Sequence, residues 1–316
     1  MGTPKTERRK KTSNIVSIII LILGALLLLY PVASTLSYQY RTIKQNEAYS
    51  TDIDALDEGA KQEQLRRAYE YNDRLLATGP HARPAVEGDP GFDDYMAQLT
   101  LPEQYHIMAR IRVPAINVDL PVYHTTQPKV LYDGAGHMYG STLPVGGLGT
   151  NSVISAHTGM VNAAMFDQLP MLKEGDDIFI EVMGETLRYQ MTSREVVKPD
   201  RYDAVRYEPD LDQVTLITCT PYGLNTDRLL VHAVRVPMDP HQEIPDAGMG
   251  WSWWMIAVVL IVLIVLLLIA WKRHRDRKRR RERERDTRRT ENSAQESAAL
   301  DAEASETESD TGYSAR

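Results

Sequence analysis

The stretch Val214-Thr215-Leu216-Ile217-Thr218-Cys219 is a run of apolar and β-branched residues that ends at the single cysteine of the chain. Such a run is typical of a buried β-strand. The next four residues, Thr220-Pro221-Tyr222-Gly223, include the proline and glycine of a turn. The cysteine is therefore expected where a strand meets a loop, a common place for functional side chains. Position alone favours an inert core thiol, because free cysteine is among the most buried residue types.

Similar short runs precede and follow this strand. They span residues 107–113, 118–123, 152–155, 178–183, 187–197 and 229–236. Clusters of Pro, Gly, Asp and Asn separate them, which predicts a compact antiparallel barrel or sandwich. We also expect a short helix at 163–169 and a helical region at 38–77 that stops before Gly79-Pro80.

Two apolar segments, Ile15 to Leu36 and Trp253 to Trp271, flank this region. Each approaches the roughly 20 residues that a helix needs to cross a bilayer. Lys and Arg precede the first and follow the second, so both termini are expected in the cytoplasm and residues 37–252 outside. The first segment also resembles a cleaved signal peptide, with Val32-Ala33-Ser34 as the cleavage site. Its long apolar core favours a retained anchor.

Charge agrees with this layout. The chain has a net charge of −7, and residues 37–250 contain 18 Lys and Arg against 31 Asp and Glu. An outer region this acidic argues against nucleic acid as a partner. The basic run from Lys272 to Arg289 is more simply explained by topology and by contact with anionic lipid. The residues after Arg289 are too poor in large apolar groups to form a core.

These features divide the chain into consecutive parts. We expect a basic N-terminus at 1–14, a transmembrane segment at 15–36, a helical region at 37–79, a loop at 80–100, a β domain at 101–240, a linker at 241–252, a transmembrane helix at 253–271 and a basic, then disordered, tail at 272–316.

Two further motifs change the interpretation of Cys219. His157 follows one β run in Ser155-Ala156-His157-Thr158-Gly159, and Arg228 begins another in Asp227-Arg228-Leu229-Leu230-Val231. A short loop would return Arg228 beside Cys219. Thiol chemistry needs a thiolate, a proton donor for the leaving amine and positive charge for the oxyanion. Taken singly, such a histidine is usually structural and such an arginine usually a solvated charge.

The other histidines offer weaker sites. His106, His124 and His137 lack metal-ligand spacing and cysteine partners, and a single cysteine excludes a disulfide framework. His232 would share a face with Arg228 if the strand alternates regularly, so it is the only other base worth testing. A lining or surface role is favoured for it.

The motifs resemble those of the sortase family. Thr215-Leu216-Ile217-Thr218-Cys219 resembles the sortase TLxTC signature, and the segments around His157 and Arg228 resemble its histidine and arginine motifs. Leu143-Pro144-Val145-Gly146-Gly147 and Cys219-Thr220-Pro221-Tyr222-Gly223-Leu224-Asn225-Thr226 are similar to the pilus-assembly sortases, called class C. The similarity extends from about Asp89 to Val236.

The resemblance implies a mainly β protein: a closed eight-stranded sortase barrel with an N-terminal helical region, flanked by two transmembrane helices. It implies that Cys219 attacks the Thr–Gly bond of an LPXTG-like sorting signal and forms a thioacyl intermediate. His157 would act as general acid and base, and Arg228 would stabilise the substrate and the oxyanion. Partners would be pilins bearing that signal, an acceptor lysine of another pilin and membrane lipid, with no cofactor.

Class C sortases also have a lid with a DP-aromatic motif, which Asp89 and Pro90 resemble. Gly91 follows, so the aromatic Phe92 comes one position late. The resemblance implies that Asp89 pairs with Arg228 while the ring covers Cys219. An ordinary Pro-Gly connection is the alternative.

Three other functions remain open. The enzyme could attach proteins to an amine of the peptidoglycan cross-bridge, it could be a hydrolytic cysteine peptidase, or the barrel could be a non-catalytic membrane scaffold. The C-terminal span and the Asp89 loop favour pilin polymerisation. The three side chains Cys219, His157 and Arg228 argue against a scaffold.

Overall fold

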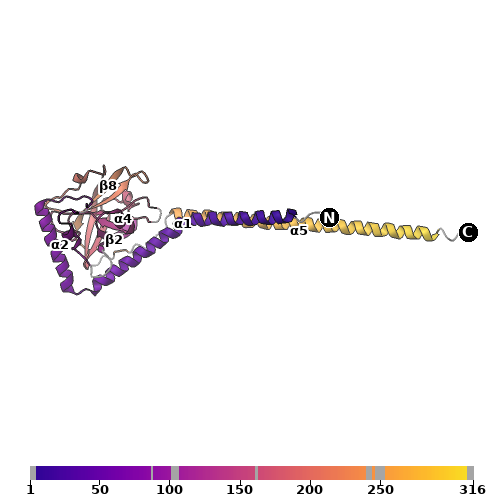
Figure 1. The fold of residues 1–316 in the computed structure, drawn as a ribbon, viewed down its shortest axis with the longest axis horizontal. Coiled ribbons are helices and arrows are strands. Elements are labelled where there is room, and N and C mark those ends of the chain that lie inside the picture. Colours follow the sequence, from indigo (N-terminus) through magenta and orange to yellow (C-terminus); the bar gives the residue numbers. More distant parts are fainter. Residues whose placement is uncertain are drawn as a thin grey trace. The chain divides into compact units, whose positions relative to one another are not determined.

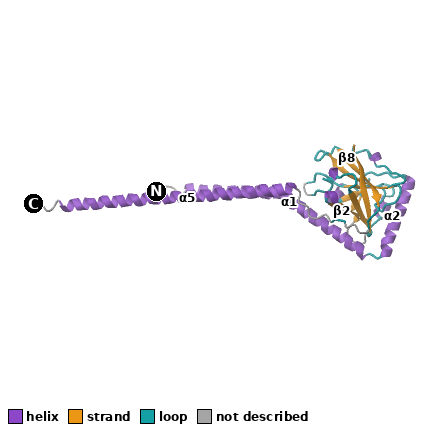
Figure 2. Ribbon diagram, turned by 180° about the vertical axis from the view of Figure 1, so that it is seen from behind, coloured by secondary structure: helices purple, strands orange, loops and turns teal. Residues whose placement is uncertain are grey.

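The structure is a computed structural model that describes residues 5–86, 88–100, 107–160, 163–239, 244–245 and 253–311. It divides into a compact unit of residues 29–251 and a second unit of residues 1–28 and 252–316. The expected linker at 241–252 lies outside the described residues, except for Ile244 and Pro245. Figures 1 and 2 show that the first unit contains all the strands.

Eight strands form a closed barrel in the order β1-β2-β3-β4-β7-β8-β6-β5. Their bounds are β1 Ile107–Val113, β2 Val118–His124, β3 Ala135–His137, β4 Thr150–Ser155, β5 Asp177–Val182, β6 Glu185–Val197, β7 Asp212–Thr220 and β8 Asp227–Val236. The predicted barrel is confirmed, but it is mixed rather than antiparallel, because β2–β3 and β4–β7 pair in parallel. The sequence analysis missed β3, whose three residues are too few to show a period.

The short helix α3 Phe92–Met96 precedes β1, and short helical turns lie between strands: η1 Pro114–Ile116, α4 Pro128–Asp133, η2 Leu169–Met171 and η3 Tyr202–Ala204. The helix expected at 163–169 is wrong. Phe166 N donates to the carbonyl of His157 (3.1 Å) instead of to a carbonyl one turn earlier, and Pro170 stands in η2. The segment is therefore tied to the chain before it.

The expected helical region is two helices, α1 Lys5–Ala55 and α2 Glu58–Thr78. The break falls at Asp57, whose side chain accepts a hydrogen bond from Ala60 N (3.0 Å) and so caps α2. One stripe of α2 is buried in the core of the unit, at a spacing of three to four residues: Leu65, Ala68, Tyr71 and Leu75.

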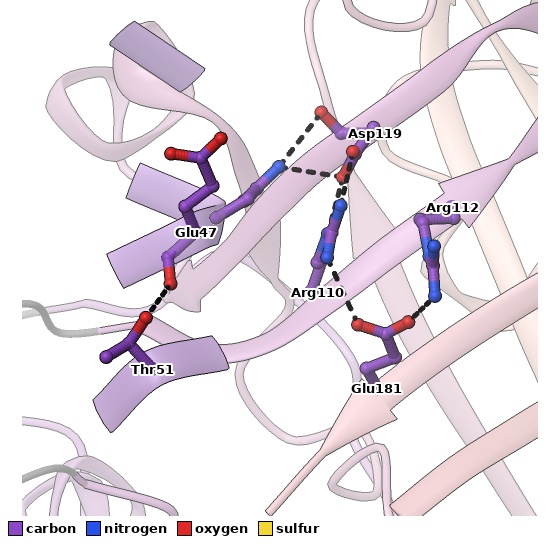
Figure 3. A network of polar contacts seen from close by, with 7 residues as sticks. Glu47, Thr51, Arg110, Arg112, Asp119 and Glu181 are labelled. Atoms are coloured by element: carbon purple, nitrogen blue, oxygen red, sulfur yellow. Dashed lines mark hydrogen bonds and ion pairs between the residues drawn. The ribbon is translucent and has the colours of Figure 1, made fainter. Parts of the chain in front are cut away.

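A polar network joins α1 to the outside of the barrel (Figure 3). Arg110 of β1 binds both oxygens of Asp119 on β2, at 2.7 Å and 2.6 Å. Asn46 of α1 donates to the same carboxylate at 2.7 Å, and Glu181 of β5 pairs with Arg110 and Arg112. Since these charged groups are largely buried, each depends on the others for compensation.

The second unit contains the N-terminal part of α1 and the helix α5 Trp253–Thr311. Both α1 and α5 contain stretches long and apolar enough to cross a membrane, judged by length and composition. The tail expected to be disordered after Arg289 instead continues α5 to Thr311. Its Ala, Glu and Gln residues are good helix formers, and a single helix requires no core.

Candidate active site

The turn between β7 and β8 brings Cys219 and Arg228 together. The two strands are antiparallel, and Cys219 is the register partner of Arg228. The connecting turn closes through hydrogen bonds from Leu224 N and Asn225 N to the carbonyl of Pro221, at 3.1 Å and 2.9 Å. The thiol is free and half-buried. The sequence expectation that Arg228 lies beside Cys219 is therefore confirmed.

The guanidinium of Arg228 is held by its own turn. Nη1 donates to the carbonyl oxygens of Asn225 (3.3 Å) and Asp227 (3.0 Å). Among the described residues, its other N–H groups have no protein acceptor. Arg228 thus presents fixed positive charge and spare donors next to a thiol.

His157 approaches Cys219 from the opposite side of β7. Strand β4 runs parallel to β7, with Ser155 opposite Ile217, so His157 and Cys219 each stand two residues further along. Two hydrogen bonds continue the pairing beyond β4: Ala156 N donates to Ile217 O (3.1 Å), and Thr218 Oγ1 donates to Ala156 O (2.9 Å). Partial burial lowers the pKa of His157 below its usual value, so its imidazole is mostly neutral at pH 7.

The loop after His157 is braced by Asp167, a residue that the sequence analysis did not select. One carboxylate oxygen, Oδ1, accepts hydrogen bonds from Gly159 N (2.7 Å) and Thr158 Oγ1 (2.9 Å). Burial raises the pKa of this carboxyl, while the two hydrogen bonds oppose the rise. A Cβ on Gly159 would come within 4.0 Å of Tyr222 and Gly223. The loops that follow His157 and Cys219 are therefore in contact.

No sequence pattern pointed to Asp167. It lies within the segment 163–169 that was expected to be helical, and its two donors lie eight and nine residues earlier. Only the three-dimensional fold of the loop brings Asp167 into contact with Thr158 and Gly159.

The lid segment is organised around Tyr139 rather than around Arg228. His81 N and Arg83 N donate to the carbonyls of Gly140 (2.9 Å) and Tyr139 (3.0 Å). The Tyr139 hydroxyl donates to Pro90 O at 2.6 Å, and the Arg83 guanidinium lies 5.8 Å from the centre of the Tyr139 ring. These contacts hold both ends of the segment against the barrel.

Asp89 does not pair with Arg228 in this structure. Its carboxylate binds both terminal nitrogens of Arg83, at 2.9 Å and 2.7 Å, and accepts from Val86 N at 2.7 Å. The Arg83 guanidinium holds the pKa of this carboxyl below its usual range. An arginine six residues away within the same loop offers a bidentate partner at a small cost in loop ordering.

Phe92 likewise lies elsewhere than the resemblance implied. Gly91 has φ +80° and precedes α3, and Phe92 packs its ring 5.6 Å from Tyr139 and 6.1 Å from Tyr95. Phe92 is thus packed against the core cluster that contains both tyrosines. The inserted glycine turns the ring into this aromatic group.

The lid residue that packs on the face of Cys219 is Ala82. Alternation along β7 and β8 puts Ile217 and Leu230 on the same face as Cys219 and Arg228. These two residues belong to a buried apolar group, here called the outer patch, which consists of Ala82, Met138, Val153, Ala204, Val205, Ile217 and Leu230. Through Ala82, the lid therefore packs against the apolar surface that adjoins the thiol.

The other histidines considered from the sequence do not lie beside the thiol in the described part of the chain. His232 pairs with Thr215, four residues along β7 from Cys219, and so lies away from the thiol. His124 and His137 are buried and hydrogen-bonded to the carbonyls of Gln98 (2.8 Å) and Thr142 (2.9 Å). His106 lies outside the described residues. In the described part of the chain, no group of three or more His, Cys, Asp or Glu could hold a metal ion.

Strands β4, β7 and β8 thus bring a histidine, a cysteine and an arginine together at one end of a closed barrel, and this arrangement agrees with the comparisons with known proteins. The family model described as Sortase domain matches residues 111–236. The chain is 28% identical over 129 residues to sortase A of Bacillus anthracis, and the match covers 41% of this chain and 60% of that relative.

Two solved structures cover the barrel more completely. Sortase C-1 of Actinomyces oris is 41% identical, with a TM-score of 0.51, and the match covers 56% of this chain and 99% of that one. Streptococcus pneumoniae sortase C is 30% identical, with a TM-score of 0.53, covering 61% and 96%. The chain belongs to the sortase family, whose members are cysteine transpeptidases, and its structural neighbours include class C sortases.

Proposed function

We propose that this chain is a membrane-anchored pilus-assembly sortase. It cleaves an LPXTG-like signal between Thr and Gly and transfers the acyl group to a lysine amine of another pilin subunit. The observation that carries the proposal is the register that sets Cys219 against Arg228, with His157 level with the thiol across β4 and β7. Catalysis and pilin substrate specificity have been described for the Streptococcus pneumoniae neighbour, which supports a pilin substrate.

In the acylation step, the reactive form is the minor one in which the thiol proton has passed to His157, and the Cys219 thiolate attacks the threonine carbonyl carbon. Arg228 donates hydrogen bonds to the substrate and to the oxygen as it becomes negative, which is the point where a fixed cation stabilises the transition state most. The carbon–nitrogen bond then breaks, and the glycine amine leaves with a proton from His157. The thioester on Cys219 retains the N-terminal part of the substrate.

In the transfer step, the lysine amine attacks the thioester carbon. His157, now neutral, accepts the proton of the attacking amine, and Cys219 leaves as thiolate. The product is an isopeptide bond, and the enzyme returns to its starting state. The lowered pKa of His157 suits the second role, because a neutral imidazole is ready to accept a proton at pH 7.

The lid controls access of substrate and water to the thiol. Ala82 occupies the outer patch beside the thiol, and the Asp89–Arg83 pair and Tyr139 hold the segment in place. A sorting signal with apolar Leu and Pro would replace Ala82 on that patch. Such a cover would keep water from the thiol until a protein substrate displaces it.

The two apolar stretches of α1 and α5 support anchoring of this sortase in a membrane. With basic residues beyond each apolar segment, the barrel lies on the extracellular side and both termini in the cytoplasm. The basic run of residues 272–289 then contacts anionic lipid heads. In this proposed topology the thiol faces the side on which pilins would be joined.

The proposal is tested with the full-length chain in detergent and an LPXTG peptide, by intact mass. We expect an acyl adduct on Cys219, faster adduct formation in Asp89→Ala, and no adduct in Cys219→Ala. His157→Asn and Arg228→Lys serve as matched variants that keep the thiol. A thiol that reacts with small reagents but not with the peptide contradicts the proposed signal, and an unreactive thiol supports the scaffold alternative.

A further inference from the structure

A pocket lies on the same face of the barrel as Cys219. It is a pocket of about 520 Å³ lined by residues of β6, β7 and β8 and by the segment before β7. Its charged and titratable lining groups are Glu195, Arg206, Glu208 and His232. None of these side chains takes part in the proposed acyl transfer.

The pocket continues the face that carries the thiol. Along β7 and β8, successive outward pairs are Cys219–Arg228, Ile217–Leu230 and Thr215–His232. The first pair is the reactive end, the second belongs to the outer patch, and the third borders the pocket. Four residues of strand separate Cys219 from Thr215, a distance of about 13 Å.

The hydrogen bonds around His232 determine which of its ring nitrogens carries the proton. Asn151 donates through Nδ2 to Arg206 O (2.7 Å), so its Oδ1 faces Thr215 and accepts the single hydroxyl proton (3.0 Å). Thr215 Oγ1 must then accept from His232 Nδ1 at 3.1 Å. The proton of a neutral His232 is therefore on Nδ1, and Nε2 is an acceptor.

This tautomer leaves two acceptors facing each other in the pocket. His232 Nε2 lies 3.3 Å from Glu195 Oε1. Burial lowers the pKa of His232, with a smaller contribution from Arg206, and these effects outweigh the opposite effect of Glu195. A neutral imidazole lone pair beside a carboxylate needs a donor between or beside them. A cation supplies both the donor and the charge.

We propose that this pocket binds a lysine or arginine side chain in the substrate segment immediately before the sorting signal. The inference rests on the proposed function. Glu195 and Glu208 outnumber Arg206 among the charged lining groups, which favours a cation. The apolar Leu and Pro of the signal precede its threonine and match the outer patch, so the residues before them extend towards the pocket. At about 3.3 Å per residue, a position four or five residues before the threonine reaches it.

The distance also separates this site from the acceptor amine. An amine that attacks the thioester must touch the carbon bound to Cys219, whereas a lysine held near His232 lies about 13 Å away along the strand. The pocket therefore acts on the donor peptide and on acylation, not on the nucleophile. The effect of the pocket can therefore be tested by measuring acylation and transfer separately.

The test uses the full-length chain in detergent and three LPXTG peptides that differ only in the residue before Leu: Lys, Ala or Glu. Acylation of Cys219 is followed by mass in single turnover, and transfer to a lysine peptide is followed separately. We expect the Lys peptide to acylate roughly two- to fivefold faster than the Glu peptide, as for a partly exposed ion pair. Glu195→Gln should remove most of this preference, and Glu195→Lys should reverse it.

Glu174→Lys is the matched control, because Glu174 is exposed, precedes β5 and changes the total charge equally. Glu174→Lys should rank the acylation rates of the three peptides in the same order as the wild-type enzyme. Equal acylation rates for the three peptides, or the same preference in both lysine variants, would overturn the inference and leave the proposed function standing. A preference confined to the transfer step would also overturn it. No adduct with any peptide would overturn the proposed function itself and this inference with it.

Discussion

Replacing Asp167 tests whether the loop after His157 must be held for acyl transfer. In Asp167→Ala, Gly159 N and Thr158 Oγ1 both lose their acceptor. Hydrogen bonds to a charged group contribute about 1.5–3 kcal/mol each, and the lower value suits a half-buried carboxylate. Two such bonds sum to about 3 kcal/mol, so we expect acylation to slow about 100-fold, since about 1.4 kcal/mol corresponds to a tenfold change.

The conservative variant separates geometry from charge. Both bonds end on the same oxygen, Oδ1, so the amide oxygen of Asp167→Asn can accept both. Neutral bonds are roughly half as strong, and we expect this variant to acylate within about tenfold of wild type. Asp176→Ala is a matched control, because it removes a similar carboxylate bond to Lys173 N (2.7 Å) before β5.

The assay is single-turnover acylation of Cys219 by an LPXTG peptide, with thermal unfolding and labelling by a small thiol reagent measured in parallel. If Asp167 positions the loop, its replacement slows acylation without slowing thiol labelling. If its role is merely structural, Asp167→Ala and Asp167→Asn both lower the unfolding temperature to the same extent. An Asp167→Ala enzyme that acylates at the wild-type rate would refute the reasoning. So would an Asn variant as slow as the Ala variant with an unchanged fold.

Two further predictions concern the lid and the core. Asp89→Ala and Arg83→Ala should each speed labelling of Cys219, because either change removes the ion pair that holds the lid; an unchanged rate in both would remove that role. Burial lowers the pKa of His137 to about 4, so the unfolded chain binds a proton more readily between pH 6.5 and 4. Stability should rise by up to about 3 kcal/mol from pH 4 to 6.5, by chemical denaturation, and His137→Gln should flatten that slope.

The strands were predictable because each carries a local signal. Alternating and β-branched runs located seven of the eight strands within a few residues, and a short β7–β8 connection was enough to place Arg228 beside Cys219. Residues 135–137 carry no such signal, because a three-residue strand is defined by its neighbours. The parallel pairing of β4 with β7 depends on chain path and was not predicted.

The details of the lid were not predictable from motifs. A DP-aromatic pattern does not say which arginine the aspartate will meet, and Arg83 is the nearer one along the chain. Gly91 redirects the chain through a positive φ, which moves Phe92 onto Tyr139. The role of Asp167 was also not predictable from a motif, because its partners are a backbone N–H and a hydroxyl, which are donors that any sequence contains.

The central claim is that the Cys219 thioester is passed to a lysine amine rather than to water. The direct measurement is product analysis after the full-length Asp89→Ala chain is incubated with an LPXTG peptide and a lysine-bearing pilin peptide. We expect a product joined by an isopeptide bond at the threonine carbonyl, absent in Cys219→Ala. Free acid alone, with the lysine peptide unchanged, would contradict the claim and indicate a hydrolytic peptidase.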